Sequence, residues 1–148
     1  MSKAFVKEDA DGPADILPDR EISPHANLVT EAGLAQIDAT IAKLQKEQVE
    51  AKEDAPSVAR DLRYWTAQRV TAQLTFNSDT SQVRFGSQVT LQRDDGRKET
   101  YRIVGMDEAD PKRGTLSYVS PLAQALIDRE VGDSVQIGGA RREITQIS

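Results

Sequence analysis

The chain contains no cysteine and a single histidine, His25. The first absence excludes disulfides, thiolate metal ligands and a cysteine nucleophile, and the second excludes a metal site built from several histidines. Aromatic residues make up only 5% of the 148 residues, so few side chains could line a deep apolar pocket. No apolar run approaches the length of a membrane span or a signal-peptide core. We therefore expect a cytoplasmic protein that binds no membrane.

Basic residues are too few for a protein that holds nucleic acid by phosphate contacts. The chain has 24 acidic and 19 basic residues, which gives a net charge of −5 and a pI near 4.9, whereas phosphate binding needs clustered Lys and Arg. Hydrophobic residues at 38% and charged residues at 29% indicate one or two small domains with much exposed surface. The expected partners are proteins or metal-bearing sites, without direct sequence-specific nucleic-acid binding.

Residues 1–27 are predicted to form a disordered acidic arm. The segment contains six acidic residues and three basic ones, and Pro13, Pro18 and Pro24 interrupt any periodicity. Low hydrophobicity with unbalanced charge is typical of a segment that cannot bury enough apolar surface to fold. The arm is either a solvated tail or a segment that touches a basic surface of a partner.

Residues 28–76 have the pattern of an antiparallel helical hairpin, a short coiled coil. Thr30 can cap a first helix over 31–53, with Val29 and Leu34 as a hydrophobic staple, and Pro56 marks the turn into a second helix over 57–74. The inner positions recur at helical spacing and are Leu34, Ile37, Ile41, Leu44, Val58, Leu62 and Trp65. A hairpin with one narrow seam needs a neighbouring domain or a partner to hold its base, and we expect Trp65 to be a packing anchor.

The remainder is predicted to be a polar linker, 77–82, and a sheet domain, 83–148, which together with the hairpin gives an α+β protein. Asp94-Asp95-Gly96 is a turn signal between strands at 88–92 and 99–105. Further strands are expected at 115–119, 135–137 and 143–147, with Gly138-Gly139 as the last turn. Ser120 caps a short helix over 122–127, with Pro121 in its first turn. The expected architecture is an antiparallel sheet packed on one short helix.

Several landmarks of this C-terminal half occur in a characteristic order. They are Arg84-Phe85-Gly86-Ser87, Tyr101-Arg102-Ile103-Val104-Gly105, Asp107-Glu108, Ser120-Pro121-Leu122-Ala123-Gln124-Ala125-Leu126 and Glu130-Val131-Gly132-Asp133. Together with Leu28–Leu34, this set resembles the Gre family of bacterial transcript-cleavage factors, as a relative with a short hairpin. The resemblance implies an FKBP-like C-terminal domain and binding of the monomeric protein to RNA polymerase at its secondary channel.

The resemblance also implies two site segments. Val119, Ser120 and Pro121 match the segment through which the family contacts the polymerase, although many relatives have Asp or Asn where this chain has Val119. The alternative is that Ser120-Pro121 is only a helix cap. Arg60, Arg63 and Arg69 on the second helix, with Tyr64 and Trp65 between them, either face RNA or the polymerase channel, or pair with acids of the first helix.

The hairpin tip lacks the family's motif, which reads approximately Gly-Asp-x-x-Glu-Asn-Ala-x-Tyr. Carboxylates remain at Glu50, Glu53 and Asp54, either as weak tip candidates or as a solvated turn. In the family, tip carboxylates help hold a Mg²⁺ ion of the polymerase active site, so the chain needs no cofactor of its own and is not itself an enzyme. The helices are also several turns shorter than in cleavage-competent relatives.

These observations predict a Gre-like transcription factor that modulates elongation with weak or no stimulation of transcript cleavage, and that competes with longer factors for the channel. The alternatives are a conventional cleavage factor acting through tip carboxylates, and an FKBP-like interaction domain unrelated to polymerase. Prolyl isomerisation is disfavoured because it needs an aromatic-lined apolar pocket, and the C-terminal domain offers only Phe85, Tyr101 and Tyr118, with Phe76 just before it.

Overall fold

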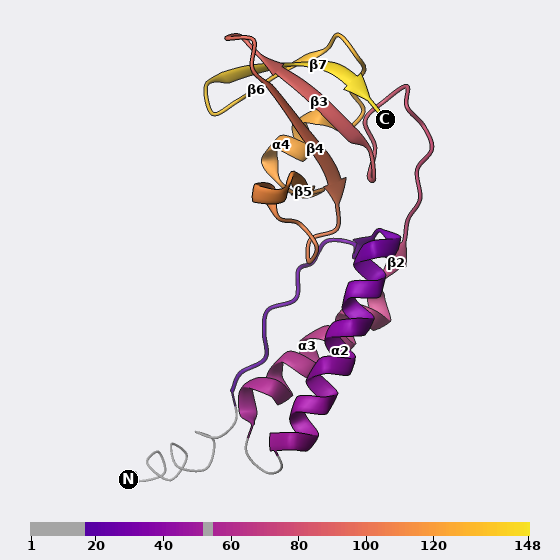
Figure 1. Cartoon of the computed structure of the whole chain (residues 1–148), viewed down its shortest axis with the longest axis vertical. Helices are drawn as coiled ribbons and strands as arrows, with labels where there is room; N and C mark the ends of the chain where they lie inside the picture. The colour runs from indigo at the N-terminus through magenta and orange to yellow at the C-terminus, as the bar shows by residue number, and fades with distance from the viewer. Residues whose placement is uncertain (1–16, 52–54) are drawn as a thin grey trace. The chain divides into compact units, whose positions relative to one another are not determined.

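The computed structural model describes residues 17–51 and 55–148, which divide into two compact units (Figure 1). In these described ranges the first unit comprises residues 17–24 and Ile37–Thr71, and the second comprises His25–Gln36 and Ala72–Ser148. The division runs through helix α2, Glu31–Ala51, whose first residues belong with the sheet unit rather than with the rest of the hairpin. No helix of the described residues is long and apolar enough to cross a membrane.

Two helices dominate the first unit, as the hairpin pattern predicts. Helix α2 begins at Glu31 and helix α3 spans Pro56–Thr71, so Pro56 is the first residue of α3, where a proline's fixed φ and missing N–H cost nothing. Helix α3 ends before the predicted Leu74 because the chain turns into strand β2, Gln73–Leu74. This strand pairs in parallel with β1, Leu28–Val29. Two-residue strands have no periodicity to detect, and neither strand was predicted.

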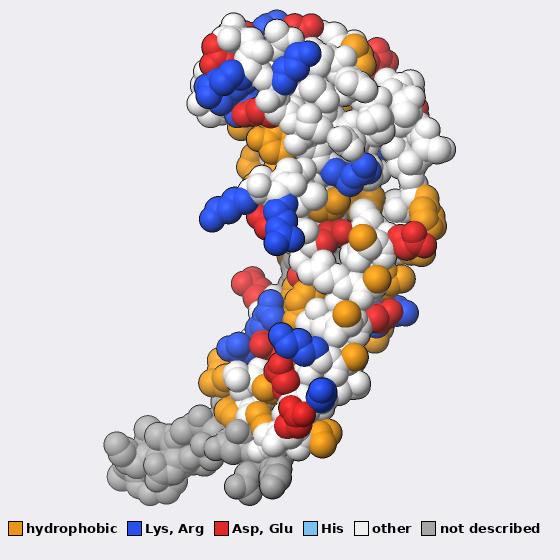
Figure 2. Space-filling model, viewed as in Figure 1, with side chains coloured by type: hydrophobic (Ala, Val, Ile, Leu, Met, Phe, Trp, Pro, Cys, Tyr) orange, Lys and Arg blue, Asp and Glu red, His pale blue; other side chains and the backbone are white. Residues whose placement is uncertain are grey.

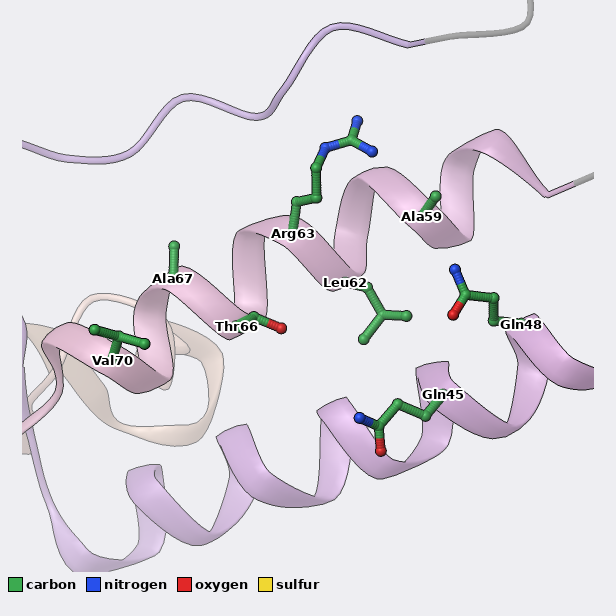
Figure 3. A pocket seen from close by; sticks show the side chains of 8 residues that line it. All are labelled: Gln45, Gln48, Ala59, Leu62, Arg63, Thr66, Ala67 and Val70. Atoms are coloured by element: carbon green, nitrogen blue, oxygen red, sulfur yellow. The ribbon is translucent and has the colours of Figure 1, made fainter.

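The seam of the hairpin is partly open. Ile37 and Leu44 of α2 are buried, but Leu62 and Trp65 of α3 are only half-buried. Leu62 lines a groove of about 580 Å³, and Figure 3 shows it facing Gln45 and Gln48 of α2 across this groove. The expected anchor Trp65 packs edge-on against Tyr64, with ring centroids 5.2 Å apart, so its packing is less complete than for a core residue.

The arginines of α3 follow the prediction in part. Arg69 pairs with Asp38 of α2, its Nε lying 2.7 Å from the carboxylate. Arg63 instead pairs with Asp19, which precedes the hairpin, and Arg60 pairs with its neighbour Asp61 at 3.2 Å. The helix therefore uses an acid from the N-terminal segment where an acid of the first helix was expected.

The disordered acidic arm over 1–27 stays a prediction, and only its last residues can be described. Residues 1–16 lie outside the described residues, but residues 17–27 have defined contacts. Asn27 is buried, the Tyr118 hydroxyl donates a hydrogen bond to the Ala26 carbonyl, and Asp19 and Arg20 form ion pairs with α3. Composition alone missed these contacts because their partners lie far away in the sequence.

The sheet of the second unit has the strand order β5-β4-β3-β7-β6. The strands are β3, Gln88–Arg93; β4, Lys98–Val104; β5, Thr115–Ser117; β6, Ser134–Ile137; and β7, Ala140–Ile147. The short helix α4, Pro121–Leu126, and a 3-10 turn, Pro111–Arg113, complete it. Buried apolar side chains, among them Leu91, Ile103, Leu126 and Ile144, form one core between the sheet and α4. The predicted fold class, a helical hairpin followed by a sheet with one short helix, is confirmed.

One strand pair departs from the predicted antiparallel arrangement. β3 pairs antiparallel with both β4 and β7, and β6 pairs antiparallel with β7, but β4 and β5 run parallel. Residues 105–114 carry the chain from the end of β4 back to the level of Arg102, and this connection contains the 3-10 turn. A parallel partner needs such a crossover in place of a tight hairpin, so the sheet is mixed.

Candidate functional site

Val119, Ser120 and Pro121 form a short corner between β5 and α4. The Ser120 backbone is extended, with φ −67° and ψ 154°, and its side chain accepts a hydrogen bond from the Ala123 N–H at 3.4 Å. Its own N–H donates to the Ser117 carbonyl at 2.9 Å. Pro121, the first residue of α4, is exposed. Ser120 is therefore the helix cap that the sequence predicts, and Pro121 presents its ring on the surface beside that cap.

The corner is also held from its N-terminal side. The Gln124 side-chain amide donates to the Tyr118 carbonyl at 2.6 Å, and the Val119 N–H donates to the Ser117 hydroxyl at 3.3 Å. The Tyr118 ring packs edge-on against Phe85, with centroids 5.8 Å apart, and burial raises the pKa of its phenol. These hydrogen bonds fix the backbone of the corner.

The hairpin tip is described only in part. Glu50, near the end of α2, is exposed, whereas Glu53 and Asp54 lie outside the described residues. The dipole of a helix disfavours a negative charge at its C-terminus, so helix α2 does not stabilise the carboxylate of Glu50. No group of three or more His, Asp or Glu residues is arranged to hold a metal within residues 17–51 and 55–148.

Glu108 caps helix α2 from a distant part of the chain. Its Oε2 accepts hydrogen bonds from the N–H groups of Thr30 at 3.0 Å and Gly105 at 3.1 Å. Its Oε1 accepts one from the Thr30 hydroxyl at 2.5 Å. The Thr30 hydroxyl oxygen in turn accepts from the Gly33 N–H at 3.0 Å. In a local capping box, a Glu three residues after the cap would reach back to the cap N–H; here Glu108 does so.

Gly33 occupies the position where that local Glu would stand. A Cβ added to Gly33 would lie 2.2 Å from Oε2 of Glu108, closer than atoms can approach, so this site takes only glycine while Glu108 keeps its place. In the sequence, Asp107-Glu108 is only a family landmark, and no role for Glu108 was predicted. The sequence does contain a sign of this contact, because Thr30-x-x-Gly33 has the spacing of a capping box but Gly in place of the acidic residue.

The comparisons with known proteins concern mainly the C-terminal half. Residues 78–147 match the family model of the C-terminal domain of the transcription elongation factors GreA and GreB. Over 64 residues the chain is 47% identical to transcription elongation factor GreA of Desulfovibrio desulfuricans, which is 43% of this chain and 40% of that protein. Over 71 residues it is 46% identical to GreB of Neisseria meningitidis serogroup B, which is 47% of this chain and 44% of that protein. The chain thus spans less than half the length of these relatives.

Solved structures of this kind are similar over most of the chain at low identity. GreA factor homolog 1 (Gfh1) of Thermus thermophilus matches over 84% of this chain and 99% of its own, with 18% identity and a TM-score of 0.44. A GreA/GreB factor from Nitrosomonas europaea matches over 82% of this chain and 98% of its own, with 15% identity and a TM-score of 0.41.

The fold defines a class of protein in which a helical hairpin is followed by a curled mixed sheet packed on one short helix. Within that class, residues 78–147 match the GreA/GreB C-terminal domain, so this part of the chain is related to the bacterial Gre transcription elongation factors. The resemblance read from the sequence landmarks is confirmed.

Proposed function

We propose that this protein binds RNA polymerase at the secondary channel as a monomer and modulates elongation, with weak or no stimulation of transcript cleavage. The observation that carries the proposal is the match of residues 78–147 to the GreA/GreB C-terminal domain. That match includes the corner Val119–Pro121, which we propose as the polymerase contact. Its preformed backbone and the exposed ring of Pro121 suit a docking edge. The protein would act in the cytoplasm, where the polymerase works.

The weak effect on cleavage follows from the tip. Helix α2 has 21 residues and α3 has 16, which at 1.5 Å per residue gives about 32 Å and about 24 Å. The Gre resemblance implies longer arms in cleavage-competent factors and a tip motif that this chain lacks. Mg²⁺ requires near-ideal ligand geometry, so a carboxylate that stops short of the metal contributes little. Any cleavage would be performed by the polymerase with its own Mg²⁺.

Two measurements on the full chain test this function. Binding to core RNA polymerase, measured at equilibrium, should be detectable and should be competed by a longer Gre-type factor. Cleavage of the transcript in a backtracked complex should change little when the protein is added at a saturating concentration. Absence of binding would favour the alternative, an interaction domain unrelated to polymerase. Strong acceleration of cleavage would favour a conventional cleavage factor.

A further inference from the structure

Residues 17–24, here called the strap, belong to the same compact unit as helix α3 and contact it through side chains. The Arg20 guanidinium lies 3.9 Å from the centroid of the Tyr64 ring and 5.9 Å from that of Trp65. This distance to Tyr64 is within the range of a cation–π interaction. The strap therefore covers the aromatic pair that stands out in the sequence of α3.

Ion pairs hold the strap on both sides of this contact. Arg20 lies 3.5 Å from the Asp61 carboxylate. In the other direction Asp19 accepts a hydrogen bond from Arg63 Nε, and Arg63 Nη2 donates to the Leu17 carbonyl at 3.2 Å. Figure 3 shows Arg63 pointing away from the groove residues Leu62 and Gln48, toward the extended segment above α3. The charges alternate between the two surfaces, so they specify one register.

The contacts that hold the strap are partly exposed to solvent. Each of these pairs is at least partly exposed, with side-chain exposures of 37% for Arg20 and 72% for Asp19, and exposed ion pairs contribute little in water and less in salt. Figure 2 shows basic and acidic side chains mixed over the helical unit. Both acidic and basic groups of a partner could therefore form ion pairs with this surface. A contact of this strength favours the docked state without fixing it.

We propose that the strap is an autoinhibitory element that covers the α3 face formed by Asp61, Arg63, Tyr64 and Trp65, and lowers the affinity of the helical hairpin for RNA polymerase. The inference rests on the proposed function, binding at the polymerase secondary channel, and adds that the helical hairpin takes part in that binding. An extended chain on α3 widens a two-helix hairpin, and polymerase must displace it before the face is free. If the strap is docked in about nine molecules of ten, the apparent affinity is reduced about tenfold.

Docking is tested first, without polymerase. Trp65 is the only tryptophan of the chain, so its fluorescence and its quenching by acrylamide report on the strap in the intact protein. Asp19→Asn combined with Arg20→Gln removes the contacts without changing net charge and should increase quenching. Salt at about 0.5 M, where the screening length is about 4 Å, should do the same to the unmodified protein and leave the variant unchanged. Glu21→Gln, a charge change in the same segment outside these contacts, is the matched control.

Specific pairing is tested by a charge exchange. Asp19→Arg should release the strap by repulsion from Arg63, and adding Arg63→Asp to it should restore the quenching of the unmodified protein. Equal quenching in the unmodified, released and exchanged proteins would overturn the docked strap.

Regulation is then tested by equilibrium binding to core polymerase. The Asp19→Asn, Arg20→Gln variant should bind about three- to tenfold more tightly than the unmodified protein, while Glu21→Gln binds as the unmodified protein does. Increased quenching with unchanged or weaker polymerase binding would overturn the inhibitory role. Absence of polymerase binding by every variant would overturn both the proposed function and the inhibitory role, and the quenching results would then bear on the strap alone.

Discussion

The clearest physical consequence of this structure concerns Gly33 and Glu108. Replacing a helical Gly with Ala ordinarily stabilises a helix by up to about 1 kcal/mol. Here the new Cβ would lie 2.2 Å from Oε2, 2.5 Å from Cδ and 2.8 Å from Oε1 of Glu108, so the carboxylate must leave. Gly33→Ala should therefore destabilise the protein although it improves the helix propensity of the site.

The size of the effect follows from the bonds that Glu108 gives up. It accepts hydrogen bonds from the Thr30 N–H, the Thr30 hydroxyl and the Gly105 N–H, and a bond to a charged group contributes about 1.5–3 kcal/mol. Glu108 is half-buried, so water replaces part of this loss, and a lost helix cap typically costs about 0.5–2 kcal/mol. After the propensity gain, we expect Gly33→Ala to lower the free energy of unfolding by about 1 kcal/mol.

Urea denaturation followed by circular dichroism measures this value, and a double-mutant cycle isolates its cause. Glu108→Ala removes the clash together with the cap, so adding Gly33→Ala to it should raise the free energy of unfolding, by up to about 1 kcal/mol. The same glycine replacement thus changes sign with the background. If Gly33→Ala stabilises the unmodified protein, or if the two changes are additive, the account of a cap supplied by Glu108 is refuted.

Three further outcomes are expected from the same structure. Pro121→Arg should weaken binding to RNA polymerase at least tenfold, about 1.4 kcal/mol, in a folded variant, because it places a charge on the proposed docking edge; unchanged affinity would exclude this edge. Replacing Glu50, Glu53 and Asp54 together by Ala should leave the effect on transcription largely intact, and loss of a strong cleavage activity in that variant would contradict the proposed function. Burial raises the pKa of Tyr118, so its neutral phenol contributes stability below pH about 10 that is lost as the pH rises through the pKa of the folded protein. The free energy of unfolding should therefore fall less steeply with alkaline pH in Tyr118→Phe than in the unmodified protein.

Much of the fold was predictable because its signals are local. The turn signal Asp94-Asp95-Gly96 separates β3 and β4, whose observed bounds are Gln88–Arg93 and Lys98–Val104. They differ from the predicted ones by one residue at the end of β3 and by one residue at each end of β4. The start of α2 at Glu31 follows from Thr30, whose hydroxyl accepts from the Gly33 N–H. Alternation and capping act within a few residues, so one sequence is enough to detect them.

The features that sequence reasoning missed all depend on contacts between distant segments. β1 and β2 are two residues each and exist because Gln73 and Thr75 donate to carbonyls of residues 27 and 29. The parallel pairing of β4 with β5 depends on how residues 105–114 cross back. The strap is held by charged side chains of α3. Composition could not predict this contact, because an acidic segment is predicted to be disordered whether or not the fold places basic side chains beside it.

Two incomplete motifs in this chain have different outcomes, and the difference is informative. At the start of α2 the acid of the capping box is missing locally, and Glu108 supplies it from 78 positions away. A gap in a local motif is therefore not evidence that the chemistry is absent; it directs attention to groups that the fold brings to the same place. At the tip, such a replacement would have to come from another segment, and the described residues contain no cluster of three or more acids or histidines that could hold a metal. The helix cap can take its acceptor from a distant segment because it needs only one carboxylate placed against a few N–H groups. A Mg²⁺ site needs several oxygen ligands in fixed geometry, so the missing tip motif is much harder to replace.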